Sequence, residues 1–217
     1  MRGVACAGLL LLVGLAPARA QSVIERMHLD RLQLVSLGLG AGSIAPSQVE
    51  RTKVFGLNAD YGQLSPSWRM QFRITYWESQ FKASVLDAFA DTLQRNLVDP
   101  LATTVKRSPI SIYDAAFALG ARRLLVPGAD VSPFFSAGLA GHVINAEGEF
   151  IKGTFVERAL DDIAAGVFGE AGIRARLLRR ILVEGTVRGD LLSGFRSMQW
   201  MATGSYYFGE PRPENGR

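Results

Sequence analysis

The clearest feature of this sequence is the strict alternation of apolar and polar residues from Trp68 to Tyr76. Large apolar side chains occupy every second position, and the positions between them hold Arg69, Gln71, Arg73 and Thr75. Successive side chains of a β-strand point to opposite sides of the sheet. The segment is therefore predicted to be a strand with one apolar face and one polar face.

The same period-two alternation recurs in seven other segments. Most of the predicted strands are about nine to twelve residues long, and a tilted strand needs about nine to eleven residues to cross a bilayer. The eight predicted strands are Val35–Ala41, Phe55–Gly62, Trp68–Tyr76, Ser111–Ala121, Phe135–Val143, Ile163–Arg176, Ile181–Leu191 and Met198–Phe208.

The connections between these segments differ in length. Residues 62–66, 126–130 and 178–180 make short turns, whereas residues 78–108 and 145–162 make long loops. Short turns at one end and long loops at the other are typical of a membrane barrel. We predict an all-β fold, an eight-stranded antiparallel up-and-down transmembrane β-barrel. Its even strand count places both termini and the short turns in the periplasm.

The first long loop contains a pattern of a different period. Leu86, Phe89 and Leu93 recur at helical spacing after Ser84, which predicts one short helix that ends before Pro100. The helix either folds over the barrel mouth or the outer leaflet, or forms a binding surface for a ligand, a partner or lipopolysaccharide. The extracellular ligand is not identified by the sequence.

The N-terminus has the three parts of a secretory signal peptide. A positive start at Arg2 precedes an apolar run from Val4 to Leu15 and the triplet Ala18-Arg19-Ala20. The alternative, an uncleaved membrane helix, has a shorter run than the ~20 residues that span a bilayer. We predict a signal peptide at residues 1–20, a lead-in at 21–30, a barrel domain at 31–209 and a tail at 210–217.

Composition and charge exclude several classes of protein. Without residues 1–20 the chain has 22 Lys and Arg against 20 Asp and Glu, and no cysteine. This balance argues against a nucleic-acid partner, which needs a clustered basic excess. No later window contains eighteen uncharged apolar residues, which argues against an α-helical membrane protein.

Alternation by itself also fits a soluble barrel, whose apolar face points inward. Two features favour lipid outside and a polar interior. The polar faces contain charges of both signs, which would pair inside a narrow barrel. The predicted luminal charge network consists of Arg69, Arg73, Asp114, Glu170, Arg174, Glu184 and Arg188. Small inward residues such as Gly120, Gly138 and Gly172 are expected to make room for the arginines, so that side chains fill the lumen.

The second feature is a set of aromatic residues near the strand ends. Aromatic rings of membrane barrels gather at the two lipid–water interfaces. The predicted interfacial aromatics are Tyr61, Trp68, Tyr76, Tyr113, Trp200, Tyr206 and Phe208.

The signal peptide, the eight segments and the closing Tyr206-Tyr207-Phe208 resemble the small outer-membrane β-barrel proteins of OmpA and OmpX type. The resemblance implies a monomer in the bacterial outer membrane, in contact with lipid and lipopolysaccharide. It also implies recognition by the barrel-assembly machinery through a terminal aromatic, here Tyr206 and Phe208. Nine residues follow Phe208 in this chain, so that motif is internal.

Some barrels of this size are enzymes that modify lipid A. The deacylase kind uses a His and a Ser two residues apart, but Val143, Ile144 and Asn145 follow His142. The sequence predicts no catalytic residue, metal site or cofactor, because the two histidines are far apart and lack such partners. The leading hypothesis is a non-enzymatic structural or surface-interaction protein. The alternatives are a soluble periplasmic lipocalin-like barrel that binds a small apolar ligand and, third, a lipid A-modifying enzyme.

Overall fold

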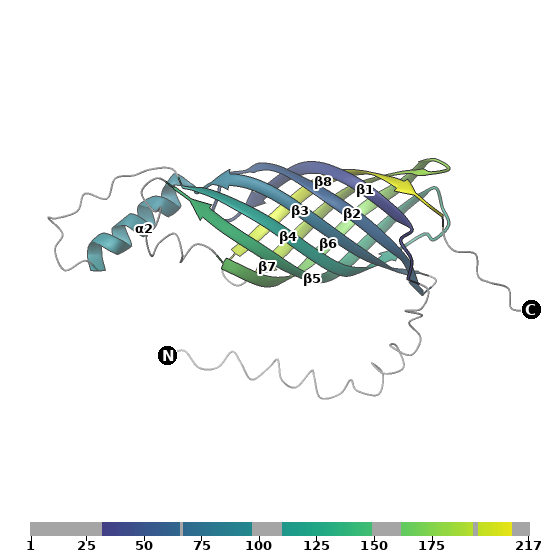
Figure 1. Ribbon diagram of the computed structural model, residues 1–217, viewed down its shortest axis with the longest axis horizontal. Coiled ribbons are helices and arrows are strands. Elements are labelled where there is room, and N and C mark those ends of the chain that lie inside the picture. Colours follow the sequence, from purple (N-terminus) through teal and green to yellow (C-terminus); the bar gives the residue numbers. More distant parts are fainter. Residues whose placement is uncertain (1–31, 66, 97–109, 149–161, 193–194, 210–217) are drawn as a thin grey trace, which may run out of the picture.

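The structure is a computed structural model that describes residues 32–65, 67–96, 110–148, 162–192 and 195–209 (Figure 1). The predicted signal peptide (1–20), lead-in (21–30) and C-terminal tail (210–217) lie outside the described residues, as do parts of both long loops.

Each of the eight predicted segments corresponds to a strand. The strands are 11 to 17 residues long, so the prediction of about nine to twelve was too short. Backbone pairing continues beyond the alternating stretch, for example to Ser111↔Glu147, because the ladder bonds do not depend on side-chain polarity. The strands are β1 Ser36–Pro46, β2 Thr52–Ser65, β3 Trp68–Gln80, β4 Ser111–Leu124, β5 Val131–Glu147, β6 Asp162–Leu178, β7 Ile181–Leu192 and β8 Phe195–Tyr207.

The sheet closes on itself. Each strand pairs antiparallel with its neighbour in sequence, and β1 pairs with β8 from Ser36↔Tyr207 to Pro46↔Ser197. Closure satisfies the backbone groups that an open edge would leave unpaired. The predicted eight-stranded antiparallel up-and-down barrel is confirmed.

The two ends of the barrel differ, as Figure 1 shows. The turn end holds the start of β1, the end of β8 and the connections β2–β3, β4–β5 and β6–β7. The loop end holds the other connections, including the helix α2, Ala83–Asn96. This confirms the predicted short helix, and Leu86 packs it against Ile110 and Ala146 at the barrel rim. Within the described residues, no helix has the length and apolarity needed to cross a membrane.

Two residues at predicted outward positions, Val35 and Ala59, are buried. Val35 precedes β1 and is 1% exposed, although its position in the alternation predicts an outward side chain. Its N–H donates to the carbonyl of Asp60, and β2 becomes irregular after that residue. Gly62, with φ +88°, brings the bulged backbone against Val35, where a Cβ on the glycine would lie 3.0 Å from the valine methyl. The bulge therefore covers Val35.

Most large apolar side chains of the wall point outward, and many polar side chains point inward. Outward residues are exposed and apolar, for example Leu39 (73%), Leu139 (70%) and Ile163 (81%). Inward positions carry buried polar groups, including Arg73 (3%) and Glu170 (5%). This distribution is the reverse of that in a soluble domain, whose apolar side chains are mostly inside.

Candidate functional site

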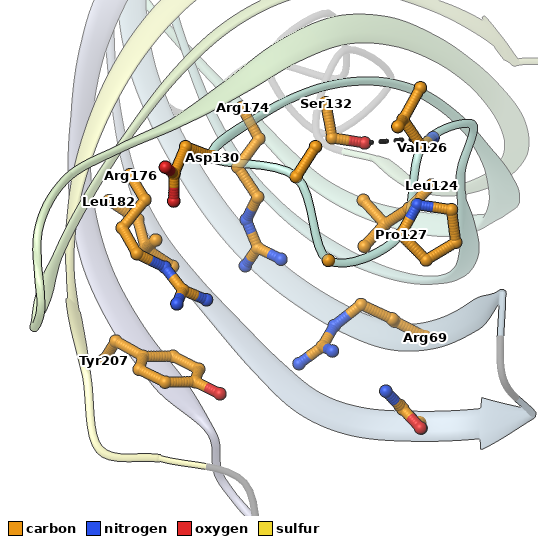
Figure 2. Close-up of a pocket in the computed structure, with 13 residues that line it drawn as sticks. Arg69, Leu124, Val126, Pro127, Asp130, Ser132, Arg174, Arg176, Leu182 and Tyr207 are labelled. Atoms are coloured by element: carbon orange, nitrogen blue, oxygen red, sulfur yellow. Dashed lines mark hydrogen bonds between the residues drawn. The ribbon is translucent and has the colours of Figure 1, made fainter.

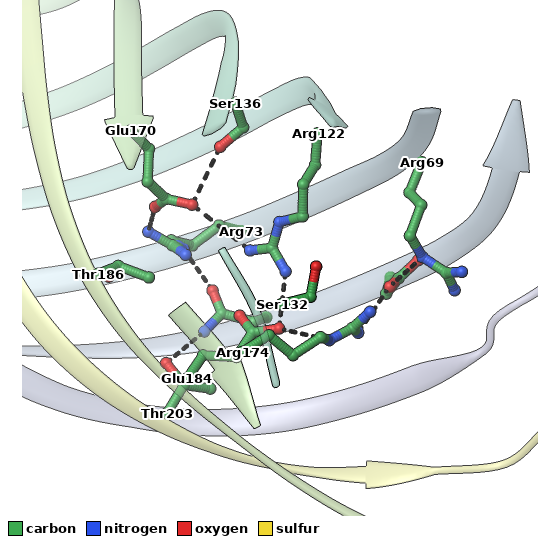
Figure 3. Close-up of polar contacts among 12 residues, drawn as sticks. Arg69, Arg73, Arg122, Ser132, Ser136, Glu170, Arg174, Glu184, Thr186 and Thr203 are labelled. Atoms are coloured by element: carbon green, nitrogen blue, oxygen red, sulfur yellow. Dashed lines mark hydrogen bonds and ion pairs between the residues drawn. The ribbon is translucent and has the colours of Figure 1, made fainter. Parts of the chain in front are cut away.

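The interior of the barrel is the candidate site, and its largest feature is a chain of charged side chains near the turn end (Figure 3). We call it the luminal network. It runs through Arg69, Asp60, Arg174, Glu184, Arg122, Glu170 and Arg73. Five of the eight strands contribute, so the network ties together opposite sides of the wall.

Asp60 joins two arginines at the outer part of this network. Arg69 Nε donates to Asp60 Oδ2 over 2.8 Å, and Arg174 Nη2 donates to the same oxygen over 2.9 Å. Asp60 Oδ1 accepts the backbone N–H of Gly62 over 2.9 Å. The carboxylate is thus held by both its oxygens in a bulged part of β2, with its charge balanced by two guanidinium groups.

Two glutamates continue the network toward the middle of the barrel. Arg122 donates to Glu184 Oε1 over 2.7 Å and to Glu170 Oε1 over 3.4 Å. Arg174 Nε lies 3.0 Å from the same Glu184 oxygen, and Arg73 makes an ion pair with Glu170. Each carboxylate therefore contacts two arginines. A buried charge is costly unless it is paired in this way.

Neutral polar groups complete the coordination of these charges. Ser136 donates to Glu170 Oε1 over 3.1 Å, and Arg73 Nε donates to Asn58. Asn58 in turn donates to Thr203 Oγ1 over 2.9 Å, which extends the hydrogen-bonded region to β8.

Two of the predicted network residues lie outside this chain of contacts. Arg188 pairs with Asp190 of its own strand at 2.5 Å, and Ser197 donates to that carboxylate over 3.4 Å. Asp114 contacts His142 Nδ1 at 2.9 Å and, among the described residues, no arginine. The sequence interpretation also did not single out Asp60, Arg122 and Asp190. The inward positions of Asp60 and Asp190 in the alternation could have identified these two residues, whereas the adjacent Arg123 makes the pattern ambiguous at Arg122.

The small inward residues serve a purpose different from the expected one. A Cβ on Gly120 or Gly138 would lie 2.6 or 2.8 Å from the ring of Phe168, and a Cβ on Gly172 would lie 2.7 Å from that of Phe134. These glycines therefore make room for phenylalanine rings, not directly for arginines. The rings then support the charges, because Arg122 lies 3.9 Å from the ring centre of Phe134 and Arg188 lies 4.1 Å from that of Phe168.

A cluster of apolar side chains lies in the lumen toward the loop end, which the sequence interpretation did not anticipate. Trp77 and Phe195 stack with ring centres 6.3 Å apart and planes 6° apart. We call this group the apolar plug. Its buried members are Ile44, Val49, Val54, Trp77, Ile112, Leu192, Phe195 and Met201. The plug lies toward the loop end and the luminal network toward the turn end, so apolar contacts and ion pairs both occupy the interior.

The predicted interfacial aromatics lie on the outward face near both ends. Tyr76, Trp200, Tyr206 and Phe208 are 41 to 54% exposed, while Tyr61, Trp68 and Tyr113 are half-buried. Arg123 lies 5.8 Å from the ring centre of Trp68, and Arg180 donates to Tyr206 Oη over 2.7 Å. Apolar rings beside cationic groups suit a boundary between lipid and water.

The described residues contain no group of three or more His, Cys, Asp or Glu side chains placed to hold a metal ion. The His142–Asp114 pair is the arrangement most similar to a catalytic one, since an acid orients the imidazole. His142 is only 4% exposed and faces the lumen.

The sequence matches no protein-family model and no curated protein. The fold is similar to that of Neisserial surface protein A, with a TM-score of 0.50 and 11% identity, covering 80% of this chain and 96% of that one. OprG of Pseudomonas aeruginosa has a TM-score of 0.49 and 12% identity, covering 82% of this chain and 98% of that one. Ail of Yersinia pestis has a TM-score of 0.47 and 11% identity, covering 82% of this chain and 100% of that one. At 11% identity, the likeness to Neisserial surface protein A concerns the fold alone.

Proposed function

We propose that this protein is a non-enzymatic β-barrel of a bacterial outer membrane, which anchors its loop-end segments at the cell surface. The observation that carries the proposal is the polarity of the wall. Exposed apolar side chains surround the barrel, whereas ion pairs and an apolar plug fill its interior. A continuous apolar surface of this extent requires a non-aqueous partner, and lipid fits a closed barrel.

The soluble lipocalin-like alternative needs the opposite arrangement. Phe72 and Ile74 would have to line a cavity, with Arg69 and Arg73 in water. In the structure Arg69 and Arg73 are 4% and 3% exposed and lie inside, and an inward side chain alternates with an outward one along β3. The geometry therefore argues against a soluble barrel with an apolar ligand.

The environment of His142 supports a non-enzymatic role. A lipid A deacylase needs a nucleophile beside the histidine and access to lipid. Asp114 is the partner of the imidazole among the described residues, and both side chains are buried in the lumen. We expect the mass spectrum of lipid A to be unchanged when the protein is expressed. Loss of an acyl chain would contradict this part of the proposal.

The loop end is the part available for surface interactions. The contact of Leu86 with Ile110 and Ala146 holds the start of α2 at the rim, and from there the helix extends away from the barrel (Figure 1). Contact of the outward face with lipid and lipopolysaccharide, and recognition of Tyr206 and Phe208 by the barrel-assembly machinery, follow from the proposal. Both remain predictions.

Cell fractionation tests the location. We expect the protein in the outer-membrane fraction, extracted only by detergent and running faster on gels before boiling than after. Protease added to intact cells should cut within residues 78–108, while a periplasmic marker protein stays whole. Recovery in the soluble periplasmic fraction would overturn the proposal.

A further inference from the structure

The lumen opens at the turn end into a cavity of about 180 Å³ (Figure 2). One wall is the β4–β5 connection, from Leu124 to Ser132, and the other is made by side chains of β3 and β6 together with Tyr207. We call it the turn-end cavity. It is in contact with solvent, because Val126, Gly128 and Asp130 of its wall are exposed.

The charges around this cavity are unbalanced. Arg69, Arg174 and Arg176 line it, against one lining carboxylate, that of Asp130. The cavity and the luminal network behind it together contain five arginines and four carboxylates, so a positive excess remains. The cavity is therefore positive, and the low dielectric of the barrel interior strengthens its attraction for an anion.

The guanidinium groups are also held in position. In Figure 2 the side chains of Arg69, Arg174 and Arg176 extend into the same space. Arg174 contacts Asp60 through Nη2 and Glu184 through Nε, and a guanidinium has five N–H donors in all. Arg176 lies 5.3 Å from the ring centre of Tyr207, and this stacking holds it at the mouth.

We propose that the turn-end cavity binds a phosphate group. A phosphate accepts hydrogen bonds from several directions and carries up to two negative charges, which matches guanidinium groups that approach from different strands. The volume is several times the roughly 30 Å³ that a water molecule occupies in the liquid, so a phosphate fits with some of its water. The cavity belongs to the barrel itself, so the proposal does not depend on the membrane location.

The test uses the purified, folded protein in micelles of a zwitterionic detergent. The melting temperature is followed by tryptophan fluorescence while inorganic phosphate is titrated against chloride at equal ionic strength. A ligand that binds only the folded state raises the melting temperature, so we expect a saturable rise with phosphate and none with chloride. Arg176→Gln should weaken the apparent affinity roughly 10- to 100-fold, the loss expected for hydrogen bonds to a charged group.

Two further variants make the result specific. Arg51→Gln is the matched control, because Arg51 is stacked 5.4 Å from the ring centre of Trp200 near the loop end and the change removes the same charge. It should leave the phosphate effect intact. Asp130→Asn removes the lining carboxylate and should strengthen binding. All the variants alter residues at the barrel ends, and heat-modifiable gel migration verifies that they fold.

A second arm distinguishes the sources of the phosphate group. Short-chain phosphatidylglycerol replaces inorganic phosphate in the same micelles. If inorganic phosphate raises the melting temperature and the rise requires Arg176, the ligand is a free phosphate. If only phosphatidylglycerol raises the melting temperature, the ligand is a lipid headgroup. The proposal is overturned if neither probe stabilises the protein more than chloride does, or if Arg51→Gln and Arg176→Gln weaken the effect equally.

Discussion

Replacement of Glu170 by Gln tests whether the luminal network stabilises the barrel. Glu170 makes ion pairs with Arg73 and Arg122 and accepts a hydrogen bond from Ser136, and its side chain is fully buried. Glutamine has nearly the same shape but no charge. The substitution therefore removes the electrostatic partner of Arg73 without creating a cavity.

The size of the effect follows from these contacts. At 3.4 Å, the Arg122–Glu170 distance, the gross attraction between two charges is roughly 5 kcal/mol at an effective dielectric constant of about 20. Loss of one partner from a buried pair typically costs about 3–5 kcal/mol, because the remaining charge stays buried. Arg122 keeps its 2.7 Å contact with Glu184, and the amide oxygen of the glutamine can still accept a hydrogen bond. We therefore expect the free energy of unfolding to fall by about 3 kcal/mol.

Urea titration of the folded barrel in detergent, followed by tryptophan fluorescence and gel migration, measures this free energy. Glu147→Gln is the matched control, because Glu147 is exposed at the loop-end rim and its loss should change stability by less than about 0.5 kcal/mol. The double variant Arg73→Gln/Glu170→Gln should recover part of the lost free energy of unfolding, because Arg73 no longer leaves an unpaired charge in the lumen. Equal stability of the Glu170 and Glu147 variants would refute the reasoning.

Three further variants test other parts of the interior. Gly138→Ala should destabilise the barrel by about 1–3 kcal/mol in urea titration, because the new Cβ would lie 2.1 Å from a backbone oxygen. Gly141→Ala of the same strand is the control. Its Cβ would meet nothing within 4 Å, so the variant should be nearly as stable as wild type. Trp77→Ala should cost about 3–5 kcal/mol through the cavity left in the apolar plug. Conductance in planar bilayers should nevertheless stay at baseline in that variant, since the luminal network still fills the barrel; an open channel would show that the plug alone closes it. Asp114→Asn should cost about 1–3 kcal/mol, because it weakens the charge-assisted contact with the buried His142. A melting temperature equal to wild type would show that this pair contributes nothing to stability.

Sequence reasoning predicted the strands because their pattern is local. Along β3 from Trp68 to Tyr76 each residue shows by its own polarity which side of the wall it faces, and the buried positions follow that order. The pattern became ambiguous where adjacent residues were similar. Arg122 and Arg123 are adjacent in sequence and have the same polarity. Only the pairing of β4 with β5, which sets Arg122 opposite Ser136, places Arg122 inside the lumen.

The apolar plug shows a second limit of the pattern. The alternation places Tyr76 on the outward face but ends there, and the next residue, Trp77, is an apolar residue at an inward position. Closure of the barrel brings Trp77 against Phe195, which is 118 positions later in the chain. The interior therefore contains an apolar cluster toward the loop end, although many inward residues of the strands are polar.

The sequence by itself determined the number of strands, the polarity of the two faces and the short helix, because each depends on the spacing of neighbouring residues. Only the tertiary structure decided which charges meet. The stagger between strands in the closed barrel sets which inward side chains share a level, so Asp60 of β2 contacts Arg174 of β6 and Asp114 contacts His142. The turn-end cavity arises in the same way, since its three arginines come together only when β3 and β6 face each other across the lumen.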